Sequence, residues 1–201
     1  NVLYLLLIMS KTALVILLIS SASSIVFFIP KNSLYKFLSI YGPIYNNKKY
    51  SNNQIINFYY YGMYNYYQNN LEVSGNTFIN ASNSGSVYGP RFYYCDGAMQ
   101  VNGNTINLTG TSTLYGMYTY YCDATTSNRA SFANNMITLD GPTTKYGLYN
   151  SYNYYHDYVY NTIIVRGAGT SYAARIYGYA GHVVKNNNFI GLSTGTNYGL
   201  Y

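Results

Sequence analysis

The chain has 201 residues, of which 8% are charged and 19% aromatic, with 30 tyrosines and no tryptophan. So little charge excludes a solvated disordered chain, and abundant Tyr, Asn, Thr and Gly is typical of short strands joined by tight turns. Of the formal net charge of +6, residues 1–71 hold five lysines and no acid, whereas residues 72–201 hold six basic and five acidic side chains. The body of the chain therefore lacks the basic stripe of a nucleic-acid-binding protein, and no nucleic acid is expected as a partner.

Residues 12–29 form a run of 18 residues without a charge. A basic start, an apolar stretch and a patch of small residues are the layout of a secretory signal, but about 20 apolar residues also suffice to span a membrane. We expect residues 1–30 to be a hydrophobic N-terminal helix that acts as a signal peptide or a membrane anchor, with a buried hydrophobic element as the third interpretation. Lys31 and Lys36 follow the run and favour the signal peptide over an anchor.

Both leading interpretations take the rest of the chain across a membrane or fix it to one. We therefore expect a secreted or cell-surface protein whose membrane contact is confined to residues 12–29. Residues 31–52 are expected to be an N-terminal cap or linker. The chain starts at Asn1 and stops within a repeat unit, so we expect it to be truncated at its C-terminal end.

Two motifs recur in one register over residues 53–201. The first is a Tyr-Gly pair or a relative of it, with spacings of 27, 27, 31, 26 and 26 residues between its second positions. Those positions are Gly62, Gly89, Gly116, Gly147, Ala173 and Gly199. The second motif is an asparagine before an apolar pair, at Asn76, Asn104, Asn135, Asn161 and Asn187. A shared register excludes drift of a low-complexity sequence.

A unit of this length is too long for one hairpin and lacks the apolar stripe of a helical repeat. Its short alternating runs between turn residues predict two or three strands per unit. The simplest solution is an all-β solenoid of about six coils, the first one imperfect, in which each strand pairs in parallel with its equivalent about 4.8 Å away. An antiparallel tyrosine-rich sandwich or barrel is the alternative.

Stacking sorts the side chains into columns. One column is apolar and is expected to face inward: Met63, Pro90, Met117, Leu148, Ala174 and Leu200. The next column contains two arginines and is expected to face outward: Tyr64, Arg91, Tyr118, Tyr149, Arg175 and Tyr201. The five motif asparagines are expected to stack at a turn, each side-chain amide bonding to the one above and the one below.

The "NxI-x-L…YGxY" units resemble those of bacterial secreted and surface right-handed parallel β-helix proteins, the pectate-lyase-like superfold. The resemblance covers about residues 53–201. It implies the fold, but it implies little about function, because this superfold hosts lyases, glycosidases, adhesins and phage tailspikes.

Two pairs of reactive residues occupy equivalent positions of consecutive coils. Cys95 and Cys122 would lie about 5 Å apart, which predicts a disulfide in an exported protein; the alternative is a pair of stacked free thiols. Asp96 and Asp123 would repel each other unless a cation such as calcium lay between them; the alternative is a pair of solvated turn aspartates.

His156 and His182 are also equivalent in register, and Asp157 is adjacent to the first of them. Two histidines and a carboxylate can hold a transition metal, so these three residues are a candidate metal site. The alternative is that both histidines lie at a turn and point to water.

Two further features are candidate binding surfaces. The longest unit contains extra residues that must bulge from its coil, with Asn128 and Arg129 as the natural contacts. The outward column could stack on sugar rings or form a self-association surface, with Arg91, Tyr118, Tyr149 and Arg175 as its main residues. The alternatives are a neutral loop and ordinary cross-strand packing.

No convincing acid/base pair can be assembled from the five acidic residues. We therefore expect an exported structural or binding protein, adhesin-like and without a cofactor, whose partner is an extracellular glycan, a host surface or a second copy. The alternative is a carbohydrate-active enzyme, a polysaccharide lyase or glycoside hydrolase, whose catalytic coils lie partly outside this chain.

Overall fold

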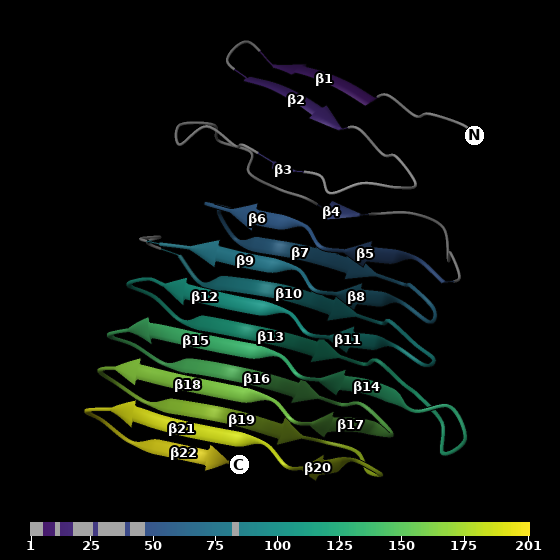
Figure 1. Cartoon of the computed structure of the whole chain (residues 1–201). Coiled ribbons are helices and arrows are strands. Elements are labelled where there is room, and N and C mark those ends of the chain that lie inside the picture. The colour runs from purple at the N-terminus through teal and green to yellow at the C-terminus, as the bar shows by residue number, and fades with distance from the viewer. Residues whose placement is uncertain (1–5, 11–12, 18–25, 28–38, 41–46, 82–84) are drawn as a thin grey trace.

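The computed structural model describes residues 6–10, 13–17, 26–27, 39–40, 47–81 and 85–201, with side chains from residue 47 onward. Every regular element in these ranges is a β-strand (Figure 1). Within them, no helix has the length and hydropathy that a membrane crossing requires.

The N-terminal helix expected over residues 1–30 is not supported. Those parts of it that are described are strands: β1 (Leu6–Ser10), β2 (Ala13–Leu17) and β3 (Val26–Phe27). β1 and β2 pair antiparallel. A short apolar run does not distinguish strand from helix by its periodicity, which is why the sequence misled here. The rest of the expected signal or anchor lies outside the described residues.

From β3 onward the chain forms a parallel β-solenoid of about six coils with three sheets, as Figure 1 shows. We call the sheets I, II and III in the order in which each coil visits them. Sheet I contains β4 (Ser39–Ile40), β7 (Tyr61–Tyr66), β10 (Val87–Tyr93), β13 (Leu114–Tyr120), β16 (Lys145–Ser151), β19 (Ser171–Tyr177) and β22 (Asn197–Leu200). Sheet II contains β5 (Lys49–Ser51), β8 (Glu72–Ser74), β11 (Gln100–Asn102), β14 (Ala130–Ala133), β17 (His156–Val159) and β20 (Val183–Lys185). Sheet III contains β3, β6 (Gln54–Ile56), β9 (Thr77–Asn80), β12 (Thr105–Thr109), β15 (Met136–Gly141), β18 (Thr162–Gly167) and β21 (Asn188–Ser193).

The parallel pairing has the register that the repeats predicted, and it excludes the antiparallel sandwich or barrel for the solenoid. Arg91 pairs with Tyr118, and Met117 with Leu148. β5 pairs with β8, so the described end of the expected cap or linker already belongs to the solenoid. Alternate residues of sheet III are buried: Ile106, Leu108, Ile137, Leu139, Ile163 and Val165.

The glycine of the Tyr-Gly motif is required by close packing. In β13, both Gly116 and the next residue face inward, which breaks the usual strand alternation. A Cβ on Gly116 would lie 2.4 Å from the carbonyl oxygen of Gly147 and 2.5 Å from Cγ2 of Ile137. The interior is thus too thin at this point for a side chain on both inward residues.

The corner between sheets II and III needs a left-handed backbone at the residue before each motif asparagine, and not at the asparagine itself. These residues have φ between 54° and 65°: Asn52, Gly75, Gly103, Asn134, Tyr160 and Asn186. Glycine and asparagine tolerate this conformation best, which accounts for the Gly-Asn and Asn-Asn pairs in the repeats.

Candidate functional site: the tyrosine face

The motif asparagines form a continuous ladder inside the corner between sheets II and III. In each rung, the backbone N–H and the side-chain Nδ2 donate to Oδ1 of the next asparagine, as from Asn104 to Asn135 at 3.0 and 2.9 Å. The same Nδ2 also donates to a carbonyl of the preceding coil, which for Asn104 is that of Val73 at 2.9 Å. The ladder runs from Asn53 to Asn187 and satisfies buried polar groups, so its role is structural.

The disulfide expected between Cys95 and Cys122 is not formed, and both are free, buried thiols. The Cys95 N–H donates to Sγ of Cys122 at 3.3 Å, while the thiols donate to the carbonyls of Tyr93 and Tyr120 at 3.6 and 3.4 Å. The Cys95 thiol also lies 3.5 Å from the carbonyl of Asn65 in the preceding coil, so both sulfur atoms are engaged in hydrogen bonds as thiols. Burial raises the pKa of the Cys122 thiol, which makes it a poor nucleophile.

Asp96 and Asp123 lie side by side, as their spacing predicted. The Asp123 N–H donates to Oδ1 of Asp96 at 2.9 Å. Burial, followed by the charge of Asp96, raises the pKa of Asp123. In the ranges with described side chains, no three metal-ligating residues come together, so this pair has no third ligand for calcium.

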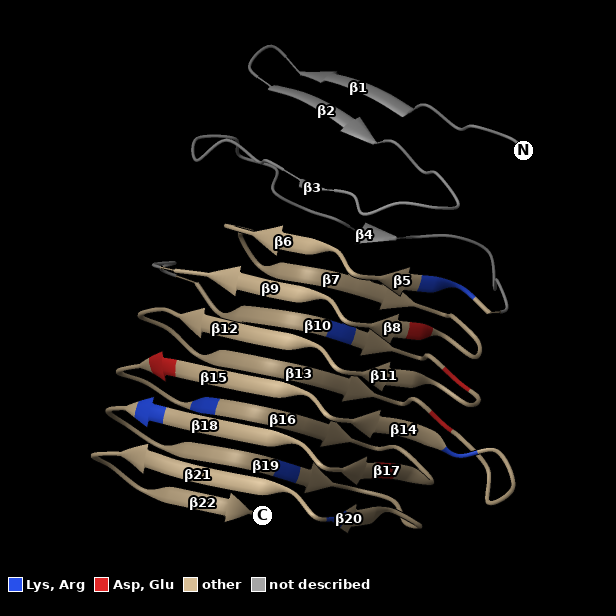
Figure 2. Ribbon diagram, viewed as in Figure 1, with Lys and Arg blue, Asp and Glu red and all other residues tan. Residues whose placement is uncertain are grey.

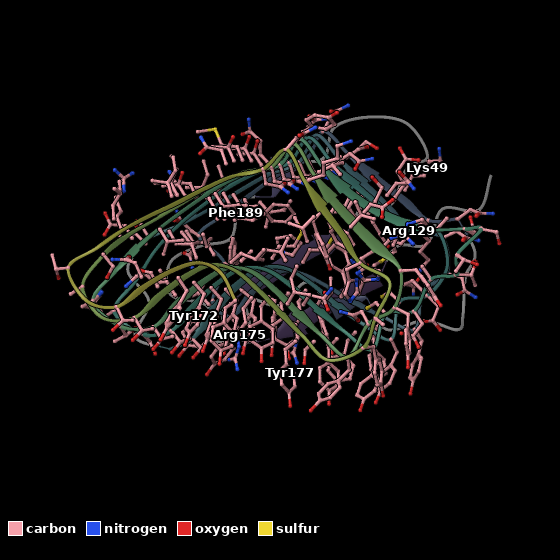
Figure 3. The ribbon with its side chains drawn as sticks, turned by 90° about the horizontal axis from the view of Figure 1, so that it is seen from below. Lys49, Arg129, Tyr172, Arg175, Tyr177 and Phe189 are labelled. Atoms are coloured by element: carbon pink, nitrogen blue, oxygen red, sulfur yellow. The ribbon has the colours of Figure 1, made fainter. Side chains whose placement is uncertain are left out.

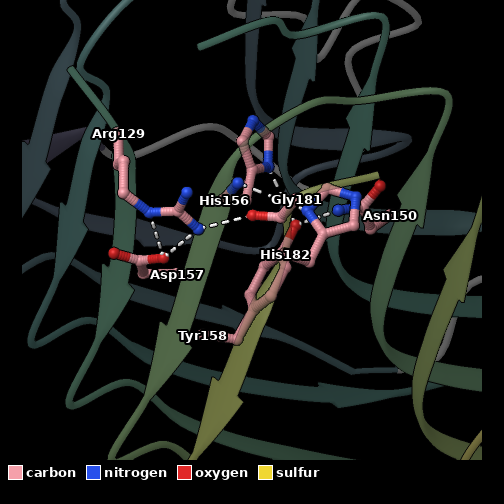
Figure 4. A network of polar contacts seen from close by, with 7 residues as sticks. All are labelled: Arg129, Asn150, His156, Asp157, Tyr158, Gly181 and His182. Carbon is pink, nitrogen blue, oxygen red and sulfur yellow. Dashed lines mark hydrogen bonds and ion pairs between the residues drawn. The ribbon is translucent and has the colours of Figure 1, made fainter. Parts of the chain in front are cut away.

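His156 and His182 are adjacent, since the His156 N–H donates to Nδ1 of His182 at 3.2 Å. His156 does not point to water but is fully buried. Its Nε2 donates to the carbonyl of Cys122 at 2.6 Å. Its Nδ1 accepts from the hydroxyl of Tyr158 at 2.9 Å (Figure 4). Burial, with a smaller effect of His182, lowers the pKa of His156 to about 3, so the ring is neutral.

The three residues proposed as a metal site do not converge. Consecutive residues of a strand face opposite sides, so His156 points inward from β17 and Asp157 points outward. Asp157 accepts from Nε of Arg129 at 2.7 Å and pairs with Nη2 of the same side chain at 2.5 Å. That Nη2 also donates to the carbonyl of Gly181 at 2.6 Å (Figure 4).

The bulged loop of the longest unit presents its two candidate contacts differently. Of its two candidate contacts, Arg129 is held against the protein and Asn128 is exposed. Asn128 closes the loop through its backbone N–H, which donates to Thr125 Oγ1 at 3.1 Å.

The outer side of sheet I and its adjoining corner carry four columns of side chains, which we call the tyrosine face. Figure 3 shows Tyr172, Arg175 and Tyr177 pointing away from the interior on this side, whereas Phe189 points into it. The first column is Tyr61, Tyr88, Tyr115, Tyr146, Tyr172 and Tyr198. The second is the predicted outward column of Tyr64, Arg91, Tyr118, Tyr149, Arg175 and Tyr201. The third is Tyr66, Tyr93, Tyr120 and Tyr177, with Ser151 between the last two. The fourth, at the corner, is Tyr67, Tyr94, Tyr121 and Tyr152.

The rings of a column stack on one another. Consecutive centroids in the first column are 5.1, 4.4, 5.0, 4.9 and 4.7 Å apart. Tyr118 and Tyr149 are 5.0 Å apart with planes at 1°, and the rings of neighbouring columns, such as Tyr115 and Tyr118, meet edge to face at 83°. Neighbours therefore cover the ring faces, and stacking on sugar rings does not fit this geometry. What the face offers to a partner is ring edges and hydroxyls.

Two arginines replace tyrosines in the second column. The guanidinium carbon of Arg91 lies 5.1–5.2 Å from the ring centroids of Tyr61, Tyr64, Tyr88, Tyr93 and Tyr118. That of Arg175 lies 5.4–5.8 Å from those of Tyr146, Tyr149, Tyr172, Tyr177 and Tyr201. Cation–π attraction stabilises both cations in the columns.

The described strands of sheet I contribute positive charge and no negative charge to the tyrosine face. No described strand of sheet I contains an aspartate or glutamate, and Figure 2 shows the two arginines on β10 and β19 without acidic neighbours on that sheet. Burial raises the pKa of Tyr88, Tyr115 and Tyr118, so these hydroxyls stay protonated. The face presents hydroxyls and guanidinium groups, which together suit a partner rich in hydrogen-bond acceptors.

Sequence reasoning found the second column but missed the other three. The signal was available, because Tyr61, Tyr88, Tyr115 and Tyr146 directly precede the motif glycines, and the "YY" pairs recur at 66, 93 and 120. Comparison of the chain with protein-family models, with curated proteins and with solved structures found no match.

Proposed function

We propose that this chain is an exported, surface-displayed β-helix protein that binds an extended partner through the tyrosine face and does not act on it chemically. We also propose that the coil is right-handed, because parallel crossovers strongly prefer this hand. The repeat units resemble those of bacterial pectate-lyase-like surface proteins, and we propose that the chain is related to them. The observation that carries the proposed function is the tyrosine face itself.

The face is a regular array along the coil axis. Its columns repeat once per coil, at the spacing of parallel strands of about 4.8 Å. Because stacking fixes each ring, the hydroxyls are pre-organised, and little entropy is lost when a partner binds them. A linear polymer with repeated hydroxyl or oxyanion groups matches such an array better than a compact ligand, so a glycan is the favoured partner.

The described acidic residues support binding over catalysis. Glu72 pairs with Lys49 at 2.6 Å, and Asp140 pairs with Arg166 at 3.6 Å. Asp157 is held by Arg129, as described above. Asp96 and Asp123 lie beside each other, two residues beyond Tyr94 and Tyr121 of the fourth column. Glycoside cleavage needs two carboxylates on either side of a bound sugar, and these five residues do not provide such a pair.

A binding panel with soluble polysaccharides tests the proposal. The double variant Tyr149→Phe/Tyr172→Phe keeps both rings and removes two hydroxyls, so affinity should fall about tenfold, as expected for two lost hydrogen bonds. Tyr160→Phe is the control, because Tyr160 is exposed at the corner between sheets II and III. Equal binding by all three proteins contradicts the proposal, and so does release of reducing ends from a bound polysaccharide.

A further inference from the structure

We propose that the tyrosine face selects acidic polysaccharides, whose carboxylate or sulfate groups pair with Arg91 and Arg175. This inference rests on the proposed function and adds the chemical class of the ligand.

The two arginines differ from the other described arginines in lacking an anionic partner. Arg129 and Arg166 each pair with an aspartate, at 2.5 and 3.6 Å. Arg91 and Arg175 form no ion pair with any side chain in the described ranges, and their own sheet carries no acid there. A guanidinium without a carboxylate partner is free to pair with an oxyanion of a ligand.

Their presentation is also fixed. Arg91 lies in the column between Tyr64 and Tyr118, and its Nη1 donates to the hydroxyl of Tyr61 at 2.7 Å. The Nε–H groups of Arg91 and Arg175 are buried and have no hydrogen-bond partner. Each guanidinium is held by the surrounding rings, and because Nε is buried, the Nη groups are the donors that remain for a ligand. A planar guanidinium matches a carboxylate or sulfate in two-point geometry, and holding it in advance lowers the entropy lost on binding.

The spacing of the arginines requires a polymer. Both occupy the second column, three coils apart, with two tyrosines between them. Three strand spacings are about 14 Å. One sugar cannot reach both cations, whereas a chain long enough to span them gains from the high effective concentration of its second anionic group.

The covered ring faces favour a polysaccharide over a single-stranded nucleic acid. Nucleic acids bind basic aromatic surfaces mainly by stacking bases on exposed rings. On the tyrosine face the stacked neighbours already occupy those positions, as for Tyr118 and Tyr149. Sugar hydroxyls and carboxylates can instead bond to the tyrosine hydroxyls at the ring edges.

The test is calorimetric titration of the whole chain with size-fractionated hyaluronan fragments, which supply carboxylates, and heparin fragments, which supply sulfates. Neutral dextran fragments of matched length are the reference. Affinity for at least one acidic series should rise about tenfold or more once the fragment spans both arginines. The two acidic series show which oxyanion is preferred.

The informative variants are Arg91→Tyr and Arg175→Tyr. Each inserts the residue that the same column carries in other coils, so the stack and its hydroxyls are kept and the cation is lost. Each single variant should remove the rise with length, and the double variant should bind acidic and neutral fragments alike. Arg166→Gln, on the outer side of sheet III, is the matched control and should bind like the unaltered chain.

Three results overturn the inference: equal binding by the arginine variants, equal binding of dextran, or tighter binding of single-stranded DNA of matched charge. Suppose that dextran binds, that the Tyr149→Phe/Tyr172→Phe variant loses this binding and that the arginine variants keep it. The proposed function then stands, and the inference of an acidic ligand is wrong. If no polymer binds, both are wrong.

Discussion

At the scale of the residue, the asparagine ladder stabilises the interior of the solenoid. Asn135 accepts two hydrogen bonds from Asn104 and donates to Asn161 Oδ1 and the Val101 carbonyl, at distances of 2.8–3.0 Å. All of these groups lie in the interior, where an unpaired polar group is costly.

Replacing Asn135 by alanine should therefore destabilise the protein by about 3 kcal/mol, because it leaves buried donors of Asn104 without an acceptor. Urea unfolding followed by circular dichroism measures this change. Asn107→Ala is the control, since Asn107 lies on the exposed side of β12 and should change stability by less than about 0.5 kcal/mol. A similar loss for both variants would contradict the structural role of the ladder.

The buried histidine makes stability depend on pH. The pKa of His156 is about 3 in the folded protein and near 6.5 in the unfolded chain, so the unfolded chain binds more protons between these values. The contribution of neutral His156 to the free energy of unfolding is complete above pH 6.5. It is lost as the pH falls toward 3, by up to about 1.4 kcal/mol per pH unit.

His156→Gln should remove this contribution while keeping a polar side chain. Unfolding at pH 7 and pH 5 should show a smaller difference for the variant than for the unaltered protein. Burial also lowers the pKa of His182, which is present in both proteins, so the comparison isolates His156. Identical pH dependence in the two proteins contradicts a buried, neutral His156.

At the scale of the element, the strands of sheet I are defined by their two consecutive inward residues. This arrangement turns the chain so that tyrosines on both sides of the motif glycine face outward, as Tyr115 and Tyr118 do around Gly116. The tyrosine face therefore depends on a glycine that makes no contact with a partner.

Gly116→Ala should destabilise the protein by about 1–3 kcal/mol, because its Cβ would clash with β16 and with Ile137. Gly199→Ala in the same column is the matched control, since no atom lies within 4 Å of the added Cβ. Thermal unfolding of both variants measures the difference. Equal melting temperatures would show that the motif glycine is not held by packing.

At the scale of the whole molecule, stability is a sum of coils and of the interfaces between them. Equivalent positions are interchangeable in such a stack. Deleting residues 89–115 removes 27 residues and joins Tyr88 directly to Gly116, which restores the Tyr-Gly motif.

This deletion should give a folded rod that is shorter by one coil, with the same circular dichroism spectrum per residue and a smaller denaturant m-value, because less surface is buried. Deleting residues 89–102 removes only 14 residues but leaves half a coil. This variant should unfold, although it loses fewer residues than the 27-residue deletion. If the smaller deletion is the better tolerated one, the coils are not the units of stability.

The asparagines and the Tyr-Gly motifs predicted most of the fold. Regular spacing places equivalent residues on top of each other, so the register, the inward column of sheet I from Met63 to Ala174 and the stacking of Asn76 to Asn187 could be derived from sequence. Leu200, also expected to face inward, is exposed. The same spacing correctly brought together the cysteine, aspartate and histidine pairs. It could not tell where each of these side chains points.

By itself, then, the sequence determined which residues are neighbours along the coil axis, because that depends only on the length of the repeat. The tertiary structure alone decided what those neighbours do. It left Cys95 and Cys122 as free thiols, buried His156, paired Arg129 with Asp157 and covered the tyrosine rings with one another. These outcomes depend on side-chain direction at the corners, which is set by left-handed residues and by contacts between sheets, and repeat length carries no information about either.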